Sequence, residues 1–127
     1  MYHRDLNVWK LSVELVQQTY ELLGSFPKNE EYVLVSQIRR SVISIPSNIA
    51  EGCGRGTNKE LYHFLNVASG SLSELETQMY IAWQLGYITD GSMAEMDEKI
   101  DAVQKLLVGF RKQIKSEIEK TTRIVEL

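Results

Sequence analysis

The chain has 127 residues and a formal net charge of −3 at pH 7, with 43% of its residues hydrophobic and 24% charged. This composition excludes an intrinsically disordered chain, and the acidic balance excludes a generally basic nucleic-acid binder. A chain of this length can bury a hydrophobic core without disulfides or metal, so we expect a single domain over residues 1–127.

Cysteine use and hydropathy indicate where the protein works. Cys53 is the only cysteine, so the chain can form neither an intramolecular disulfide nor a cysteine-rich zinc site. Charges are scattered through the first ten residues, where a secretory signal needs an apolar run. No apolar run approaches the roughly 18–20 residues of a membrane-spanning helix. We therefore expect a cytoplasmic protein with no membrane partner.

The first predicted helix covers residues 6–24. Its apolar residues recur at spacings of three and four, which is typical of an amphipathic helix. They form two neighbouring stripes, one of Trp9, Val13, Val16, Tyr20 and Leu23 and the other of Val8, Leu11, Leu15 and Leu22. Because a bundle helix needs one core stripe, the second stripe indicates a surface that a partner covers.

The second predicted helix covers residues 30–52. Asn29 can cap its start, and the glycine-rich stretch 52–56 ends it. Its apolar stripe contains Pro46, which has no N–H to donate and whose ring clashes with the preceding turn. We therefore expect a kink or a break between Val42 and Pro46.

The third and fourth predicted helices cover residues 57–86 and 91–118. Thr57 and Glu60 have the spacing of a capping box, which marks the start of the third helix. Apolar residues then keep a seven-residue repeat along it, and a similar rhythm of threes and fours follows in the fourth helix. The pattern weakens after Glu117, where the chain either frays or extends the helix.

Four amphipathic helices joined by short connections bury their apolar stripes most economically as an antiparallel up-down-up-down four-helix bundle. The predicted fold class is therefore all-α. On the third helix, Val67, Tyr80 and Ile81 point away from the core repeat. Exposed apolar residues of this kind favour a homo-oligomer over a monomer with scattered surface hydrophobes.

Charge is unevenly distributed along the chain. Residues 67–98 contain six acids and no base, whereas residues 99–127 contain seven bases and four acids. Lys105, Lys112 and Lys115 fall on the outer face of the fourth helix. We favour a solvated face with local salt bridges there over a nucleic-acid surface.

A second basic group precedes and follows the glycine-rich turn. It consists of Arg39, Arg40, Arg55 and Lys59. A glycine-rich turn that leads into a helix N-terminus offers free N–H groups to a phosphate. The spacing does not match a phosphate-binding loop of the Walker type, so a plain interhelical turn is the favoured interpretation.

Polar residues share one side of the second helix, close to its apolar stripe. They are Gln37, Arg40, Ser41, Ser44, Asn48 and Glu51. We expect a hydrogen-bonded network at a helix or subunit contact. An ion pair between Arg40 and Glu51 would require the kink at Pro46 or a second chain.

Catalytic and metal-binding patterns are weak. His3 and His63 lie far apart, and neither belongs to a metal-ligand motif. Cys53 beside His63 suggests a nucleophile, but a lone cysteine near a helix end more often packs as a small residue. We therefore expect a protein that is not an enzyme and that holds no metal and no cofactor.

Several stretches of the sequence, taken together, resemble one known family. They are Phe26-Pro27 with Glu30 and Leu34, then residues 37–41, residues 44–52 with Arg55, residues 68–72 and residues 74–76. As a set they resemble the four-helix-bundle proteins encoded in intervening sequences of bacterial 23S ribosomal RNA genes, also called the S23 ribosomal protein family. The resemblance runs from about Trp9 to Ile88 and continues more loosely through the fourth helix.

The resemblance implies a ring-like homopentamer, related to the accessory protein of diversity-generating retroelements, which looks like a nucleic-acid-binding partner of a reverse transcriptase. Carried onto this chain, Arg39, Arg40, Arg55 and Lys59 are the residues expected to contact RNA or DNA. Gln37, Asn48, Glu51 and Gly52 are expected to be structural or subunit-contact positions. The alternative is a module that binds another protein and has no affinity for nucleic acid.

Overall fold

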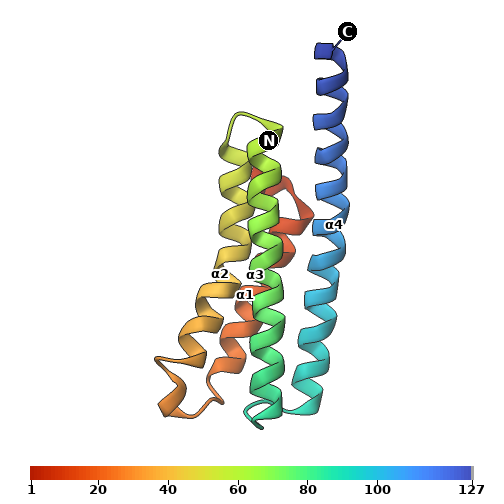
Figure 1. The fold of residues 1–127 in the computed structure, drawn as a ribbon. Helices are drawn as coiled ribbons and strands as arrows, with labels where there is room; N and C mark the ends of the chain where they lie inside the picture. Colours follow the sequence, from red (N-terminus) through yellow and green to blue (C-terminus); the bar gives the residue numbers. More distant parts are fainter. Residues whose placement is uncertain (127) are drawn as a thin grey trace.

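A computed structural model describes residues 1–126 and shows four long helices (Figure 1). Consecutive helices run in opposite directions, so the predicted all-α antiparallel four-helix bundle is confirmed. Two short 3₁₀ turns, His3–Asp5 and Lys28–Glu30, precede the first and second helices. The helices are α1 (Asn7–Leu23), α2 (Leu34–Gly54), α3 (Asn58–Gln84) and α4 (Asp90–Glu126).

The helices form a square in which α1 packs on α2 and α4, and α3 packs on the same two helices. The core lies along the centre of this square and is filled by aliphatic and methionine side chains. Burial of these side chains supplies the main stabilising free energy of the fold. The largest fully buried ones are Leu15, Ile38, Ile45, Ile49, Leu65, Leu75, Met79, Met96 and Leu107.

The core face of α1 lies between the two apolar stripes of its sequence. Two polar residues, Ser12 and Thr19, are completely buried along this face together with Leu15. The Ser12 hydroxyl donates to the Trp9 carbonyl at 2.7 Å, and the Thr19 hydroxyl contacts the Met96 sulfur at 4.0 Å. Tyr20, by contrast, is exposed. Neither predicted stripe is therefore the core stripe by itself. The strip of α1 that lies between the two stripes packs into the groove between α2 and α4.

Helix α2 differs from its predicted form at its start. Pro27 is extended, and the following 3₁₀ turn, which contains Asn29, is separated from α2 by the non-helical Val33. The helix therefore begins four residues later than predicted. It runs unbroken through the buried Pro46 to Gly54, so of the two predicted alternatives, a kink or a break, the break does not occur.

Helix α3 begins as its capping residues predict. The Thr57 hydroxyl accepts from the Glu60 N–H at 3.2 Å. At the other end the chain turns into α4 through Gly86, whose φ of 79° is a conformation that glycine adopts without strain. The Gly86 and Tyr87 N–H groups donate to the Trp83 and Ala82 carbonyls and satisfy the end of α3.

Helix α4 extends beyond the predicted end at residue 118. It continues to Glu126 and passes the start of α3 at the end of the bundle (Figure 1). The Thr121 and Thr122 hydroxyls donate to the carbonyls one turn earlier in this last part. None of the helices within residues 1–126 is long and apolar enough to cross a membrane.

Candidate functional site

The predicted structural residue Gly52 lies in a close contact between α2 and α3. A Cβ atom on Gly52 would lie 3.0 Å from the Leu61 Cδ1 and 3.0 Å from the Phe64 Cβ. The Leu61 carbonyl oxygen would be 3.3 Å away. The absence of a side chain therefore brings the two helices together at this end.

Asn48 belongs to a hydrogen-bonded cluster between the same two helices. Its amide nitrogen donates to the Ser44 carbonyl at 2.7 Å and to the Ser44 Oγ at 2.8 Å. The Ser44 and Ser71 hydroxyls are 2.8 Å apart and link α2 to α3. This part of the predicted polar network is therefore satisfied within one chain.

The polar cluster continues into an open groove of about 470 Å³ on the outer side of α2 and α3. The Gln78 Oε1 in this groove is buried and has no hydrogen-bond partner among residues 1–126. Arg40 and Glu74 line the groove and form no ion pair within the part of the chain that the structure describes. The groove is lined by Gln37, Arg40, Ser41, Ser44, Ser71, Glu74 and Gln78.

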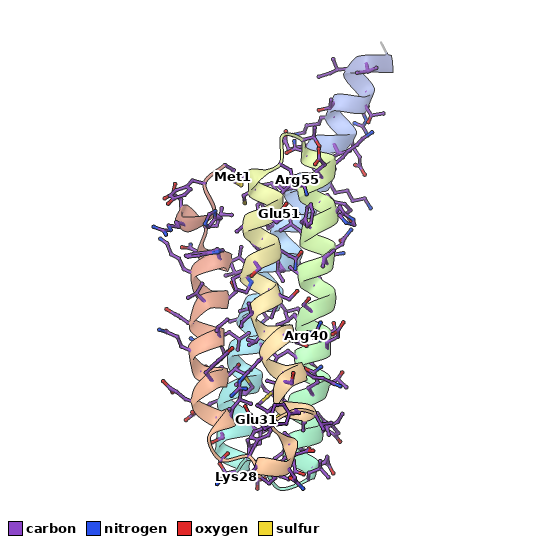
Figure 2. The ribbon with its side chains drawn as sticks, turned by 90° about the vertical axis from the view of Figure 1, so that its left-hand side faces the viewer. Met1, Lys28, Glu31, Arg40, Glu51 and Arg55 are labelled. Carbon is purple, nitrogen blue, oxygen red and sulfur yellow. The ribbon has the colours of Figure 1, made fainter. Side chains whose placement is uncertain are left out.

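Glu51 pairs with Arg55 and not with Arg40. The carboxylate of Glu51 is 2.8 Å from the Arg55 guanidinium, which also lies 3.8 Å from Glu60. Figure 2 shows Glu51 and Arg55 together near one end of the bundle and Arg40 farther along α2. Because α2 continues unbroken through Pro46, Arg40 and Glu51 are three turns apart, about 16 Å, which excludes the ion pair within one chain.

The four predicted nucleic-acid contacts do not form one surface patch. Arg39 donates to Glu31 at 2.6 Å, and this hydrogen bond raises the pKa of the Arg39 guanidinium. The same guanidinium lies 5.8 Å from the centre of the Tyr20 ring, so Arg39 faces α1. Arg40 lines the groove toward α3. Arg55 is held by Glu51 and Glu60 and lies over the Phe64 ring at 5.2 Å.

Lys59 lies at the opposite end of α3 from the loop that leads to α4. It lines a mostly apolar groove of about 530 Å³ together with Ile118, Thr121 and Val125 from the end of α4. The second half of α4 carries Arg111, Lys112, Lys115, Lys120 and Arg123. Lys59 is therefore the predicted contact that lies nearest to the basic part of α4.

A further groove, not predicted from the sequence, lies between α3 and α4 at the other end of the bundle. Its volume is about 490 Å³, and its lining combines two aromatic rings with three carboxylates. The Trp83 Nε1 donates to Asp90 at 2.7 Å, and the Tyr80 and Trp83 rings meet edge to face at 5.7 Å. The groove residues are Glu76, Thr77, Tyr80, Trp83, Asp90, Met93, Ala94 and Asp97. The sequence signal for this groove was the acidic stretch 67–98, but which of its acidic residues lie together depends on how α3 packs on α4.

The residues considered for catalysis lie in packed or exposed positions without a shared pocket. Cys53 is only 8% exposed, and burial raises the pKa of its thiol. The exposed His63 ring packs edge to face on its neighbour Phe64 at 5.1 Å. Among the described residues, no group of three or more histidine, cysteine and acidic side chains is arranged to hold a metal ion.

Comparisons with known proteins identify the family. The family model described as "23S rRNA-intervening sequence protein" matches residues 4–109. The chain is similar to a crystal structure of a protein with unknown function from the S23 ribosomal protein family from Bacteroides thetaiotaomicron VPI-5482, with 26% identity and a TM-score of 0.74. This alignment covers 83% of the present chain and 98% of that protein. No curated protein matches. The chain therefore belongs to the 23S rRNA-intervening sequence protein family.

Proposed function

We propose that the protein is a non-enzymatic, cytoplasmic subunit of a homo-oligomeric ring that serves as a scaffold and binds RNA or DNA. The observation that supports assembly most directly is the outer face of α2 and α3. This face combines unpaired polar groups with exposed apolar side chains, and neither is usual for a surface that only meets water. The number of five subunits follows from the family resemblance.

The polar part of this face has unused hydrogen-bonding capacity. A buried acceptor without a partner, such as the Gln78 Oε1, costs about 1–3 kcal/mol. Donors from a second copy that contact this acceptor remove the cost, and Glu74 offers a negative charge to the same copy. The α2/α3 face thus suits a chain with complementary polar groups.

The apolar part of this face follows the same side of α3. Val67, Glu74 and Ile81 are spaced seven residues apart, so they lie in one row, and both apolar members of the row are exposed. Burial in a subunit contact would stabilise the assembly by roughly 25 cal/mol per Å² of apolar surface removed from water. Val67 and Ile81 therefore flank the polar groove as the apolar part of the proposed contact.

Replacing Ile81 with aspartate is expected to reduce the mass of the assembly. The carboxylate would have to lose its water inside the contact, which is costly without a partner. Sedimentation velocity at one protein concentration measures the effect, and Ile81→Val, which keeps an apolar side chain, is expected to preserve the wild-type mass. An Ile81→Asp protein that sediments like wild type would remove the α2/α3 face from the assembly.

The nucleic-acid part of the proposal assigns unequal roles to the four basic residues. Arg39 and Arg55 already have carboxylate partners, whereas Arg40 and Lys59 form no ion pair within residues 1–126. Phosphate contact by Arg39 or Arg55 would compete with those partners. Arg40 and Lys59 are therefore the residues that we expect to contribute most.

Fluorescence anisotropy with labelled structured RNA and with DNA tests this order. Affinity is expected to fall steeply with salt, because each neutralised phosphate releases counterions. The pair Arg40→Ala and Lys59→Ala should weaken binding and reduce the salt slope by about 1 for each phosphate that the protein no longer neutralises. The matched pair Arg39→Ala and Arg55→Ala should have the smaller effect. Binding that is independent of salt, or an equal weakening in both pairs, would contradict the assignment.

The alternative function is a module that binds another protein without affinity for nucleic acid. The ion pairs of Arg39 and Arg55 and the net charge of −3 favour this alternative. An assembled wild-type protein that gives no salt-sensitive anisotropy change with either RNA or DNA would decide for it.

A further inference from the structure

The face shared by α3 and α4 has opposite charge at its two ends. At one end, Glu76, Asp90 and Asp97 surround the rings of Tyr80 and Trp83. These acids belong to the stretch 67–98, which contains no lysine or arginine. Neither Glu76 nor Asp97 forms an ion pair within residues 1–126. This acidic end therefore presents uncompensated negative charge next to exposed aromatic surface.

The other end of the same face is basic. The Arg111 Nε donates to the Asn66 Oδ1 on α3 at 2.9 Å, which places Arg111 on the side of α4 that borders α3. Lys115 follows one turn later on that side. It also lies eighteen residues, or five whole turns, beyond Asp97. Asp97 and Lys115 are therefore on one side of α4, about 27 Å apart.

Small or apolar side chains connect the two ends. On α3, Ser73 lies seven residues from both Asn66 and Tyr80 and so falls in the row that they define. On α4, the exposed Val108 lies seven residues before Lys115. The next residue of this α4 row, Asp101, is charged, but its carboxylate already pairs with Lys105 at 2.9 Å. The middle of the face thus carries no unpaired charge in these two rows, and it allows a second helix pair to approach.

We propose that a second copy of this chain packs on the α3/α4 face in antiparallel orientation, about a two-fold axis near the middle of the face. In this arrangement the acidic end of each copy meets the basic end of the other. Asp97 of one copy opposes Lys115 of the other, and a two-fold axis repeats each such contact. The occupant is a second copy because the same face carries both complementary charges.

The aromatic groove gains from the same arrangement. Tyr80 is 53% exposed in the single chain, and its ring borders the three carboxylates. A lysine side chain of the second copy can lay its aliphatic stem on this ring and place its ammonium group between ring and carboxylates. Exposed aromatic surface and unpaired acid are then covered by one set of side chains.

This contact goes beyond the proposed ring, because it uses α3 and α4 where the ring contact uses α2 and α3. If both exist, the two-fold contact doubles the number of chains in the ring. If the ring does not form, the same contact produces a dimer. In either case, disruption of the α3/α4 contact alone halves the mass of the particle, so the two proposals fail independently.

Charge reversal tests the contact. Light scattering should give Asp97→Lys and Lys115→Asp particles with half the wild-type mass, because each single change places like charges together twice across the two-fold axis. The double variant Asp97→Lys/Lys115→Asp restores opposite charges and is expected to regain the wild-type mass. Glu98→Lys, one residue away on a different side of α4, serves as the matched control and should leave the mass unchanged.

All three altered residues of this test are exposed or on the helix surface, and circular dichroism of each variant checks that the helical content equals that of wild type. Single variants that keep the wild-type mass would overturn the proposal. So would a double variant that stays at half mass, because restoration by the second reversal is the result that only a direct Asp97–Lys115 contact explains.

Discussion

Replacing Gly52 with valine is expected to lower the free energy of unfolding by about 2–3 kcal/mol, the cost of overpacking a closely packed contact. Any Cβ at this position would lie 3.0 Å from the Phe64 Cβ, an atom fixed to the backbone of α3. No rotation of the Phe64 side chain can relieve this contact, so α2 and α3 would have to separate. The Ser44–Ser71 hydrogen bond, which joins the same two helices eight residues earlier on α2, would be weakened by that separation.

Urea unfolding followed by circular dichroism measures this destabilisation. The matched control is Gly54→Val, two residues later in α2, because a Cβ on Gly54 meets nothing within 4 Å. The control is expected to change stability by no more than about 0.5 kcal/mol. All variants are compared at one protein concentration, since the stability of an oligomer depends on it. Equal unfolding midpoints for both variants would contradict the close contact of α2 and α3 at Gly52.

The second large effect is expected at Leu15, which has no exposed surface and lies at the centre of the core face of α1. Leu15→Ala should cost about 2–5 kcal/mol, because it removes buried methyl groups and leaves a cavity. Tyr20, from the other predicted stripe, is 41% exposed, and the Arg39 guanidinium lies 5.8 Å from the centre of its ring. Tyr20→Ala should therefore cost less than about 1 kcal/mol.

Thermal and urea unfolding of the two variants decide which side of α1 faces the core. We expect a clear order, with Leu15→Ala the far less stable protein. Comparable destabilisation at both positions would mean that α1 is rotated about its axis relative to the arrangement in the structure.

Features of the fold that depend on near neighbours in the sequence were predictable. The cap of α3 needs only Thr57 and Glu60, three residues apart, and it forms as predicted. The predicted start of α2 was too early because Asn29 suggested a cap. In the structure the backbone torsions of Val33 are not helical, so α2 begins only at Leu34. Spacing alone carries no information on that backbone torsion.

The core face of α1 could not be predicted from its apolar residues. Two stripes of similar strength flank a strip that contains Ser12 and Thr19, and a polar residue is not expected in a core. The Ser12 hydroxyl donates to the Trp9 carbonyl one turn earlier, whereas the Thr19 hydroxyl contacts the Met96 sulfur on α4. Only the packing of α2 and α4 on α1 selects this strip.

The contacts of the candidate site also divide into those that sequence spacing predicts and those that depend on the packing of distant segments. Arg55 and Glu51 are four residues apart on one helix, so their ion pair could have been expected from spacing. The pairing of Arg39 with Glu31, across the irregular start of α2, could not. Grouping Glu76 and Asp97 in one groove requires the register of α3 against α4, which no local pattern specifies.

The molar mass of the purified wild-type protein, measured by light scattering at micromolar concentration, tests assembly most directly. We expect a particle that contains a whole multiple of five chains of 14.6 kDa. A particle with the mass of one chain would contradict both the proposed ring and the two-fold contact.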